Sequence, residues 1–581
     1  MGLLFVEIGL SLLSAQPAGA TDSVSEIRGS GASILGKNCP AIFLCSEKIG
    51  LTEVNDEAVY GLVPSFALEQ AQSESGVLPF YDGGGWIPPS LVCGTAENER
   101  FPSVAVDATG NIWATVLVGE YPHPHIGVFR STDKGFTWNH VLGIYNSYDG
   151  PVGPPAIFVD PGPSPNIVYL AFSSFWKDNN GTGHTGLEIA SFASDRPSET
   201  FRSVWVANPA TFNLSEASLS VERGHGPDNT AFVLVRAVSS LTGAQYLWVF
   251  RGSRYGSWSK VLTLGGTRRY IGSGEIWSTD RATYLICTSN PDNSLPDEAK
   301  RIHILTTQDR GQSWNAVYAD APYPVVEVAI AGAQGRNQAV AFAALKYGKS
   351  DHDVYAFYTT DLGSTWGGYW MDTDNQDSRL PRVSSDGVQF DAGASAVFYF
   401  IEYYDRENDG LGNIKFLMCP VGDIAERSNW RLPNGSSLDS LVISNESLYG
   451  VEPVRGCLSL SSRSESGGTM PVVVWNTPCI SLSGDVYFVR PMAPVYMGAE
   501  EEDGHAQEIR VFFVPAERAL RIDGDLHGET RLRLYSVDGR LVASLGLSPE
   551  GKTTTVKLPD LPEGVYLWRI LQTGGRVSVI R

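Results

Sequence analysis

One eight-residue pattern occurs three times in this chain of 581 residues and constrains its fold more than any other feature. The pattern is [Ser/Thr]-x-Asp-x-Gly-x-x-Trp, and three matches to four specified positions are not expected by chance. The second and third copies lie 52 residues apart, whereas the first and second lie 176 apart, close to three times 59. We therefore expect two degenerate copies in that interval. The copies are Ser131–Trp138, Thr307–Trp314 and Thr359–Trp366, with weaker marks at Trp205, Trp258 and Trp430.

Each copy lies between two strand-like runs, which predicts a hairpin turn. The Asp carboxylate can accept hydrogen bonds from backbone N–H groups of the turn, and Gly two positions later tolerates a positive φ. The Trp ring is then free to pack between neighbouring sheets. We assign a structural role to Asp133, Gly135, Trp138, Asp309, Gly311, Trp314, Asp361, Gly363 and Trp366.

A second pair of strands precedes the turns, as in Pro102–Thr115, so that each unit of about 55 residues supplies four strands, the size of a propeller blade. Six units from residue 76 onward end in a marked Trp, and a seventh at about 433–492 supplies three strands. The missing strand is expected from Phe80–Leu91, which carries Trp86. The prediction is an all-β, seven-bladed propeller, with six blades as the alternative.

The charge of the chain excludes some partners. There are 64 Asp and Glu residues against 43 Lys and Arg, a net charge of −21, which repels phosphate backbones and argues against nucleic acid. No apolar run after the first twenty residues reaches the ~20 residues of a spanning helix. Residues 1–20 are typical of a cleaved signal peptide, although Glu7 interrupts the apolar stretch. We expect a soluble monomer after cleavage.

Seven cysteines permit disulfides in an exported chain, and the odd number leaves one thiol over. The expected pairs are Cys39 with Cys45 and Cys457 with Cys479. Cysteine and histidine spacings do not match a zinc site, so we expect no metal and no cofactor. Asp405–Gly410 resembles the start of a calcium loop, which is the alternative to a plain hairpin turn there.

The repeated turns resemble the Asp-box (BNR) repeats of the sialidase-like β-propellers over about 400 residues. Sialidases carry an arginine for the substrate carboxylate just before the first blade strand, and Glu99-Arg100-Phe101-Pro102 stands at that place here. The resemblance implies that Arg100 is a ligand-binding residue, with an ordinary surface arginine as the alternative.

The same resemblance implies an Asp acid/base between this arginine and the first turn, but Gly119–His125 contains no Asp. Ordinary sialidase chemistry is therefore doubtful. The remaining catalytic candidates are Arg100, Glu120 and Tyr403, and the ligand-binding candidates are Arg100, Tyr121, His123 and His125.

The last part of the chain changes character after an acidic linker at 496–507. Residues 508–581 alternate apolar and polar positions in short strands, which predicts a small β-sandwich. Leu534–Val542 and Leu561–Tyr566 resemble the type A C-terminal sorting domain of type IX secretion cargo, known from Bacteroidota and related bacteria. A passive carbohydrate module is the alternative.

Together these features predict a signal peptide (1–20), an undefined segment (21–75), a propeller (76–495), a linker (496–507) and a sorting domain (508–581). We expect a secreted or surface-attached protein, exported through the periplasm by the type IX machinery, whose propeller binds an extracellular glycan or protein. The alternative is an exo-glycosidase of the sialidase-like superfamily acting on terminal sugars.

Overall fold

A computed structural model describes residues 44–49 and most of 86–491 and 510–579. The described ranges are interrupted at 87–88, 96, 120–123, 146–152, 161–164, 178–179, 223–229, 267–270, 291–298, 348–350, 372–376, 387–396, 406–411, 432–440, 443–456, 466–467, 478–484, 515–517, 524–529, 536–540, 548–552, 559–563 and 571–572.

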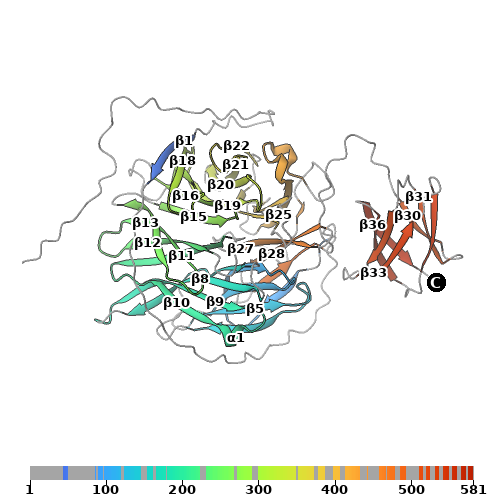
Figure 1. Ribbon diagram of the computed structural model, residues 1–581, viewed down its shortest axis with the longest axis horizontal. Helices are drawn as coiled ribbons and strands as arrows, with labels where there is room; N and C mark the ends of the chain where they lie inside the picture. The colour runs from blue at the N-terminus through green and yellow to red at the C-terminus, as the bar shows by residue number, and fades with distance from the viewer. Residues whose placement is uncertain are drawn as a thin grey trace, which may run out of the picture.

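Seven antiparallel sheets form the larger part of the molecule (Figure 1). The first three blades are β3 (Glu99–Val106), β4 (Ile112–Val118), β5 (His125–Ser131) and β6 (Asn139–Ile144); β7 (Ala156–Asp160), β8 (Ile167–Lys177), β9 (Gly183–Ala193) and β10 (Arg202–Ala207); and β11 (Phe212–Val221), β12 (Ala231–Ser239), β13 (Gln245–Gly252) and β14 (Ser259–Gly266).

Blades IV to VI continue the same order along the chain. They are β15 (Ile271–Ser278), β16 (Thr283–Ser289), β17 (Arg301–Thr307) and β18 (Trp314–Asp320); β19 (Val325–Gly332), β20 (Ala339–Tyr347), β21 (Asp351–Thr359) and β22 (Gly367–Trp370); and β23 (Asp377–Ser385), β24 (Val397–Asp405), β25 (Asn413–Pro420) and β26 (Leu441–Val442).

Blade VII closes the ring with strands from both ends of the propeller. β27 (Leu458–Glu465), β28 (Gly468–Asn476) and β29 (Val486–Val489) are completed by β2 (Ser90–Cys93), and Trp86 forms a bridge with Pro491. The first strands of successive blades lie next to one another from β3 round to β27 and back to β3. The seven-bladed prediction is confirmed, and the closing strand comes from the expected side of the chain, although it begins at Ser90.

Short elements complete the described part of the propeller. β1 (Leu44–Ile49) pairs with β18 as a fifth strand of blade IV. The helical segments are α1 (Pro197–Thr200), η1 (Val421–Asp423) and η2 (Arg427–Asn429). Within the described ranges, no helix combines the length and apolarity needed to cross a membrane.

The repeated turns form the predicted hydrogen bonds. The Asp Oδ1 atom accepts the backbone N–H four residues later at 2.9 Å in all three copies. Gly135, Gly311 and Gly363 have φ values of 89°, 79° and 79°. Trp138 then packs edge-on against Phe488 of blade VII, with ring centroids 5.2 Å apart. The turns therefore place a tryptophan between adjacent blades, as predicted.

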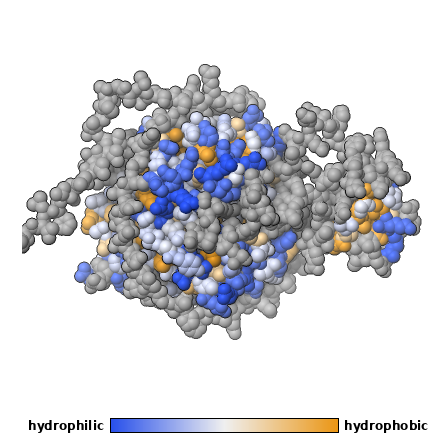
Figure 2. Space-filling model, viewed as in Figure 1, coloured by the Kyte–Doolittle hydropathy of each residue, from blue (hydrophilic) through white to orange (hydrophobic). Residues whose placement is uncertain are grey.

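Residues 510–579 form a second, smaller β unit (Figure 1). Two sheets share the buried side chains of Leu520, Ile522, Leu532, Leu534 and Leu547, which confirms a sandwich. Figure 2 shows apolar residues gathered on this unit, whereas hydrophilic residues predominate on the coloured propeller surface. The strands are β30 (Arg510–Val514), β31 (Ala519–Asp523) and β34 (Thr553–Lys557) in one sheet, and β32 (Thr530–Tyr535), β33 (Leu541–Leu547), β35 (Gly564–Ile570) and β36 (Thr573–Val579) in the other.

Candidate binding site in the central channel

The innermost strands of five blades carry a bulge near their first residues. At three of these bulges a residue other than glycine has a positive φ: Phe101 (54°), Glu216 (55°) and Leu380 (56°). A side chain in this region costs about 1–2 kcal/mol, so such residues tend to persist where the surrounding structure requires them and to mark functional sites. The bulges therefore direct attention to the channel end where the inner strands begin.

These strands surround a cavity of about 410 Å³, to which all seven blades contribute lining residues. This volume falls within the roughly 300–1,000 Å³ of small-molecule sites. The lining combines four charged side chains with three aromatic ones: Glu216, Glu275, Glu327, Arg382, Phe101, Phe158 and Trp277.

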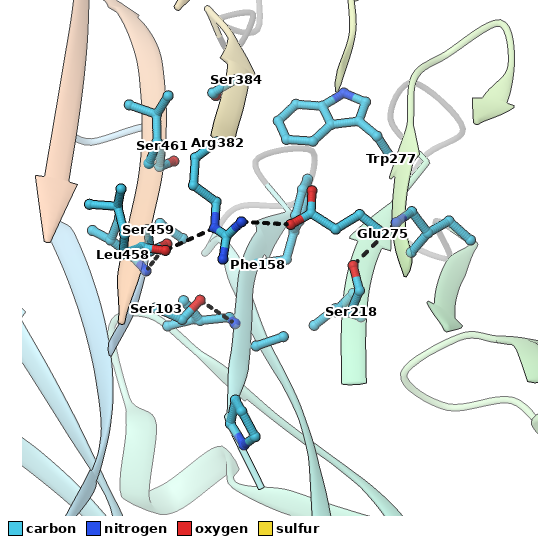
Figure 3. A pocket seen from close by; sticks show the side chains of 18 of the residues that line it. Ser103, Phe158, Ser218, Glu275, Trp277, Arg382, Ser384, Leu458, Ser459 and Ser461 are labelled. Atoms are coloured by element: carbon cyan, nitrogen blue, oxygen red, sulfur yellow. Dashed lines mark hydrogen bonds and ion pairs between the residues drawn. The ribbon is translucent and has the colours of Figure 1, made fainter. Parts of the chain in front are cut away.

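Arg382, on the first strand of blade VI, is the central charge of the cavity. Its Nη2 donates to Oε1 of Glu327 at 2.7 Å, and its Nη1 lies 3.8 Å from Oε1 of Glu275. Its Nε donates to the carbonyl of Leu458 at 2.9 Å (Figure 3). Burial opposes the charge of this guanidinium, but Glu327 and Glu275 raise its pKa above the ordinary value. Blades IV, V, VI and VII thus meet at one cation.

A ring of side-chain acceptors links neighbouring inner strands. Ser103, Ser218 and Ser459 each accept a backbone N–H from the next blade at 3.2 Å. Glu275 does the same in blade IV, where its Oε2 accepts the N–H of Ile330 at 3.4 Å. Glu275 therefore replaces a serine of the ring and still presents Oε1 to Arg382.

Trp277 adds an aromatic surface beside this charge. It lies two residues after Glu275 on β15, so both side chains are on the same face of the strand. Figure 3 shows the indole on the cavity side together with Glu275 and Arg382. The ring is half-buried and makes an edge contact with Phe158 at 6.4 Å between centroids. The cavity can therefore offer a flat apolar face and paired charges to one ligand.

The predicted site residues that the structure describes do not lie together in one site. Arg100 is the second residue of β3, but the part of this strand that lines the cavity begins at Phe101. Its Nη2 donates to the carbonyl of Gly119 at 3.4 Å. Arg100 therefore stays a prediction for ligand binding.

His125 and Tyr403 are buried in their blades. His125 stacks on Tyr145 with centroids 4.6 Å apart, and burial, with a smaller contribution from His140, lowers its pKa to about 4. Tyr403 lies in β24, where the guanidinium of Arg379 is 5.3 Å from its ring centroid. Neither side chain lines the cavity. Glu120, Tyr121 and His123 lie outside the described residues.

The metal and disulfide predictions depend partly on residues outside the described ranges. Among the described residues no three His, Cys, Asp or Glu side chains are grouped as metal ligands. Most of the calcium-like segment falls at 406–411, outside the description, and both predicted disulfides involve a cysteine outside it, Cys39 or Cys479. Cys93, Cys287 and Cys419 are buried thiols.

Sequence reasoning missed Glu275, Glu327 and Arg382. A signal for Arg382 was present, because Arg379-Leu-Pro-Arg382 repeats the pattern of Arg100-Phe-Pro-Ser103. Both segments carry the positive-φ residue before proline, so the residue after proline is equivalent in the two blades. Glu275 and Glu327 lack such a motif.

No family model and no curated protein matches the chain. Similar solved structures include the α-L-arabinofuranosidase Arb93A from Fusarium graminearum (12% identity, TM-score 0.38, covering 56% of this chain and 94% of that one). An α-L-arabinanase from Penicillium chrysogenum (11%, 0.36, 70% and 98%) and a sialidase from Trypanosoma rangeli (10%, 0.34, 83% and 83%) are also similar. Because these identities and TM-scores are low, the propeller assignment rests on the sheet order of this chain itself.

Proposed function

We propose that this protein is a secreted glycan-binding β-propeller whose ligand occupies the end of the channel where the inner strands begin. The observation that carries the proposal is Trp277 beside the Glu275–Arg382 pair in one cavity. Sugar rings present apolar faces and hydroxyl edges, so an indole with adjacent charged hydrogen-bonding groups is suited to them.

The charged groups of the cavity favour a neutral or weakly charged glycan. Three carboxylates and one guanidinium line it, and the guanidinium is engaged by Glu327 and Glu275. A strongly anionic ligand would meet an excess of negative charge, whereas sugar hydroxyls can donate to the carboxylates.

The second candidate function is hydrolysis by a pair of carboxylates. Glu275 and Glu327 contact the same guanidinium, so they lie no farther apart than the roughly 9.5 Å upper limit for glycosidase acid pairs. One acid would protonate the leaving oxygen while the other acts as a base or nucleophile. Glu216 lines the same cavity and is a third candidate.

One experiment tests both functions. The purified full chain is applied to a glycan array and, in parallel, to fluorogenic sialosides, arabinofuranosides and other glycosides. Binding without turnover supports the binding protein. Turnover that is lost in Glu275→Gln or Glu327→Gln and retained in the rim variant Asp320→Asn supports the enzyme instead. The absence of both binding and turnover on a broad panel would contradict a glycan function of the channel.

We further propose that residues 508–581 direct export by type IX secretion, which rests on the sequence resemblance described above and on a separate β-sandwich at 510–579. Deletion of residues 508–581 in a host with this machinery should retain the propeller in the periplasm. Release of the truncated protein into the medium at the wild-type level would contradict this role.

A further inference from the structure

A second cavity, of about 450 Å³, lies at the rim between blades III and IV. Its lining consists only of polar residues and glycines, with two arginines among them: Arg251, Arg310, Ser253, Ser257, Ser259 and Gln312 are its main side chains. It has no lining residue in common with the central channel. A polar cavity with two guanidiniums is suited to an oxyanion.

The two arginines are held in place by the blades themselves. Nη1 of Arg251 donates to the carbonyl of Arg310 at 2.7 Å, which joins blade III to the turn of blade IV. Arg310 has a φ of 59°, and its Nε lies 3.3 Å from Oε2 of Glu222. The Arg310 side chain is still 45% exposed. Both guanidiniums are therefore partly ordered before any ligand arrives.

The turn that borders this cavity differs from the repeated acidic turns. Residues Gly252–Trp258 read Gly-Ser-Arg-Tyr-Gly-Ser-Trp and contain no carboxylate, whereas the three intact copies each contain an Asp. In this turn blade III therefore carries Arg254 and no acid.

Two further guanidiniums extend the positive charge beyond the cavity. Arg202 and Arg254 lie 4.9 and 5.0 Å from the ring centroid of Tyr255, which is 61% exposed. Nη2 of Arg254 also donates to the carbonyl of Thr200 at 3.1 Å. Contacts with the tyrosine ring order both side chains. Four arginines therefore follow the rim from blade II to blade IV.

We propose that these four residues, Arg202, Arg251, Arg254 and Arg310, bind the sulfate or carboxylate groups of an anionic polysaccharide, with one group seated in the cavity. The net charge of −21 does not prevent this, because charges farther than about 8 Å are largely screened at physiological ionic strength. A row of cations is matched by a chain with repeated anionic groups better than by a single ion.

The test measures affinity of the full-length protein for dextran sulfate, polygalacturonate and neutral dextran, starting at physiological ionic strength. We expect one of the two anionic polymers to bind, neutral dextran not to bind, and affinity to fall as salt is raised. Arg310→Ala and Arg251→Ala should each weaken binding about tenfold, because each removes a charge-assisted hydrogen bond. Arg336→Ala, an exposed arginine on blade V, should bind like the wild type.

Folding of each variant is checked by its thermal midpoint, and Arg310→Ala is the decisive variant because its side chain is half exposed. The proposal is overturned if neither anionic polymer binds, if Arg336→Ala loses as much affinity as Arg310→Ala, or if free sulfate binds as tightly as the polymer. Equal binding of single-stranded DNA through the same arginines would overturn the polysaccharide assignment. Channel variants such as Trp277→Ala should leave this affinity unchanged, so failure here is distinct from failure of the channel proposal.

Discussion

Arg382 on the inner strand of blade VI donates through Nη2 to Oε1 of Glu327 on the inner strand of blade V, 2.7 Å away. Only 13% of the arginine side chain and 5% of the glutamate side chain are exposed. The pair joins two adjacent blades at the wall of the channel, where bulges open five of the inner strands. A substitution in this pair should therefore change both the stability of the propeller and the charge that lines the channel.

Replacing Arg382 with Met should destabilise the propeller by about 3–5 kcal/mol, because it leaves the buried carboxylate of Glu327 without its cation. The double variant Arg382→Met with Glu327→Gln should recover part of this loss. The free energy of unfolding in urea measures both, with Arg336→Ala as a surface control expected to stay within about 0.5 kcal/mol of the wild type. Equal losses in the single and double variants would contradict the pairing.

Trp314 tests the structural role of the repeated turns. Its side chain is 2% exposed and belongs to the core shared by blades III and IV, so Trp314→Ala should cost about 3–5 kcal/mol. Trp258, the corresponding mark of the degenerate turn in blade III, is only half-buried and should cost less on the same substitution. Similar losses for the two variants would show that the intact turn adds nothing to the packing of its tryptophan.

The contrast between these two turns shows what could be read from the sequence. The Asp, Gly and Trp positions each have a local physical role, so the turns, the blade length and the closing strand from the N-terminal side were predictable. The channel site depends instead on which inner-strand residues face inward. That register is set by bulges, and Glu275 and Arg382 meet although 107 residues separate them in the chain. No local pattern marks Glu275, because serine stands at the equivalent position in three other blades.

Gly135 and Gly181 can be compared to test the contact between blades I and VII that closes the ring. Both have positive φ values, 89° and 80°, so alanine should cost about 1–2 kcal/mol of backbone strain at either site. A Cβ at Gly181 meets open space, whereas one at Gly135 would overlap the ring of Phe488 on blade VII. Gly135→Ala should therefore cost about 1–3 kcal/mol more than Gly181→Ala. Equal thermal midpoints would indicate that blades I and VII are not in contact there.

Glu99 should make the stability of the ring depend on pH. This carboxyl is fully buried at the start of β3, and burial raises its pKa to about 7 despite hydrogen bonds from the side chain and backbone of Thr95. Because the folded state holds the proton of Glu99 more tightly than the unfolded state, the contribution of Glu99 to stability is greatest below about pH 4.5 and falls as pH rises to about 7. Near Glu99, the carboxyl of Asp485 also raises its pKa, whereas a hydrogen bond with the buried thiol of Cys93 lowers it.

The free energy of unfolding attributable to Glu99 should fall by about 3 kcal/mol between about pH 4.5 and about pH 7. Urea unfolding of the wild type and of Glu99→Gln at several pH values measures it, because the amide cannot ionise. The wild type should lose stability relative to Glu99→Gln as pH rises. Parallel pH profiles for the two proteins would contradict a buried, protonated Glu99.

The most direct test of the central claim is the affinity of Trp277→Ala for a glycan that binds the wild type, measured by titration calorimetry. Loss of the half-buried indole beside Glu275 and Arg382 should weaken binding at least about tenfold, because the flat apolar contact is removed. Trp370→Ala is the matched control, since Trp370 is a half-buried tryptophan of blade V outside the cavity lining, and it should bind like the wild type. Unchanged affinity in Trp277→Ala, with the fold intact, would place the ligand outside the channel.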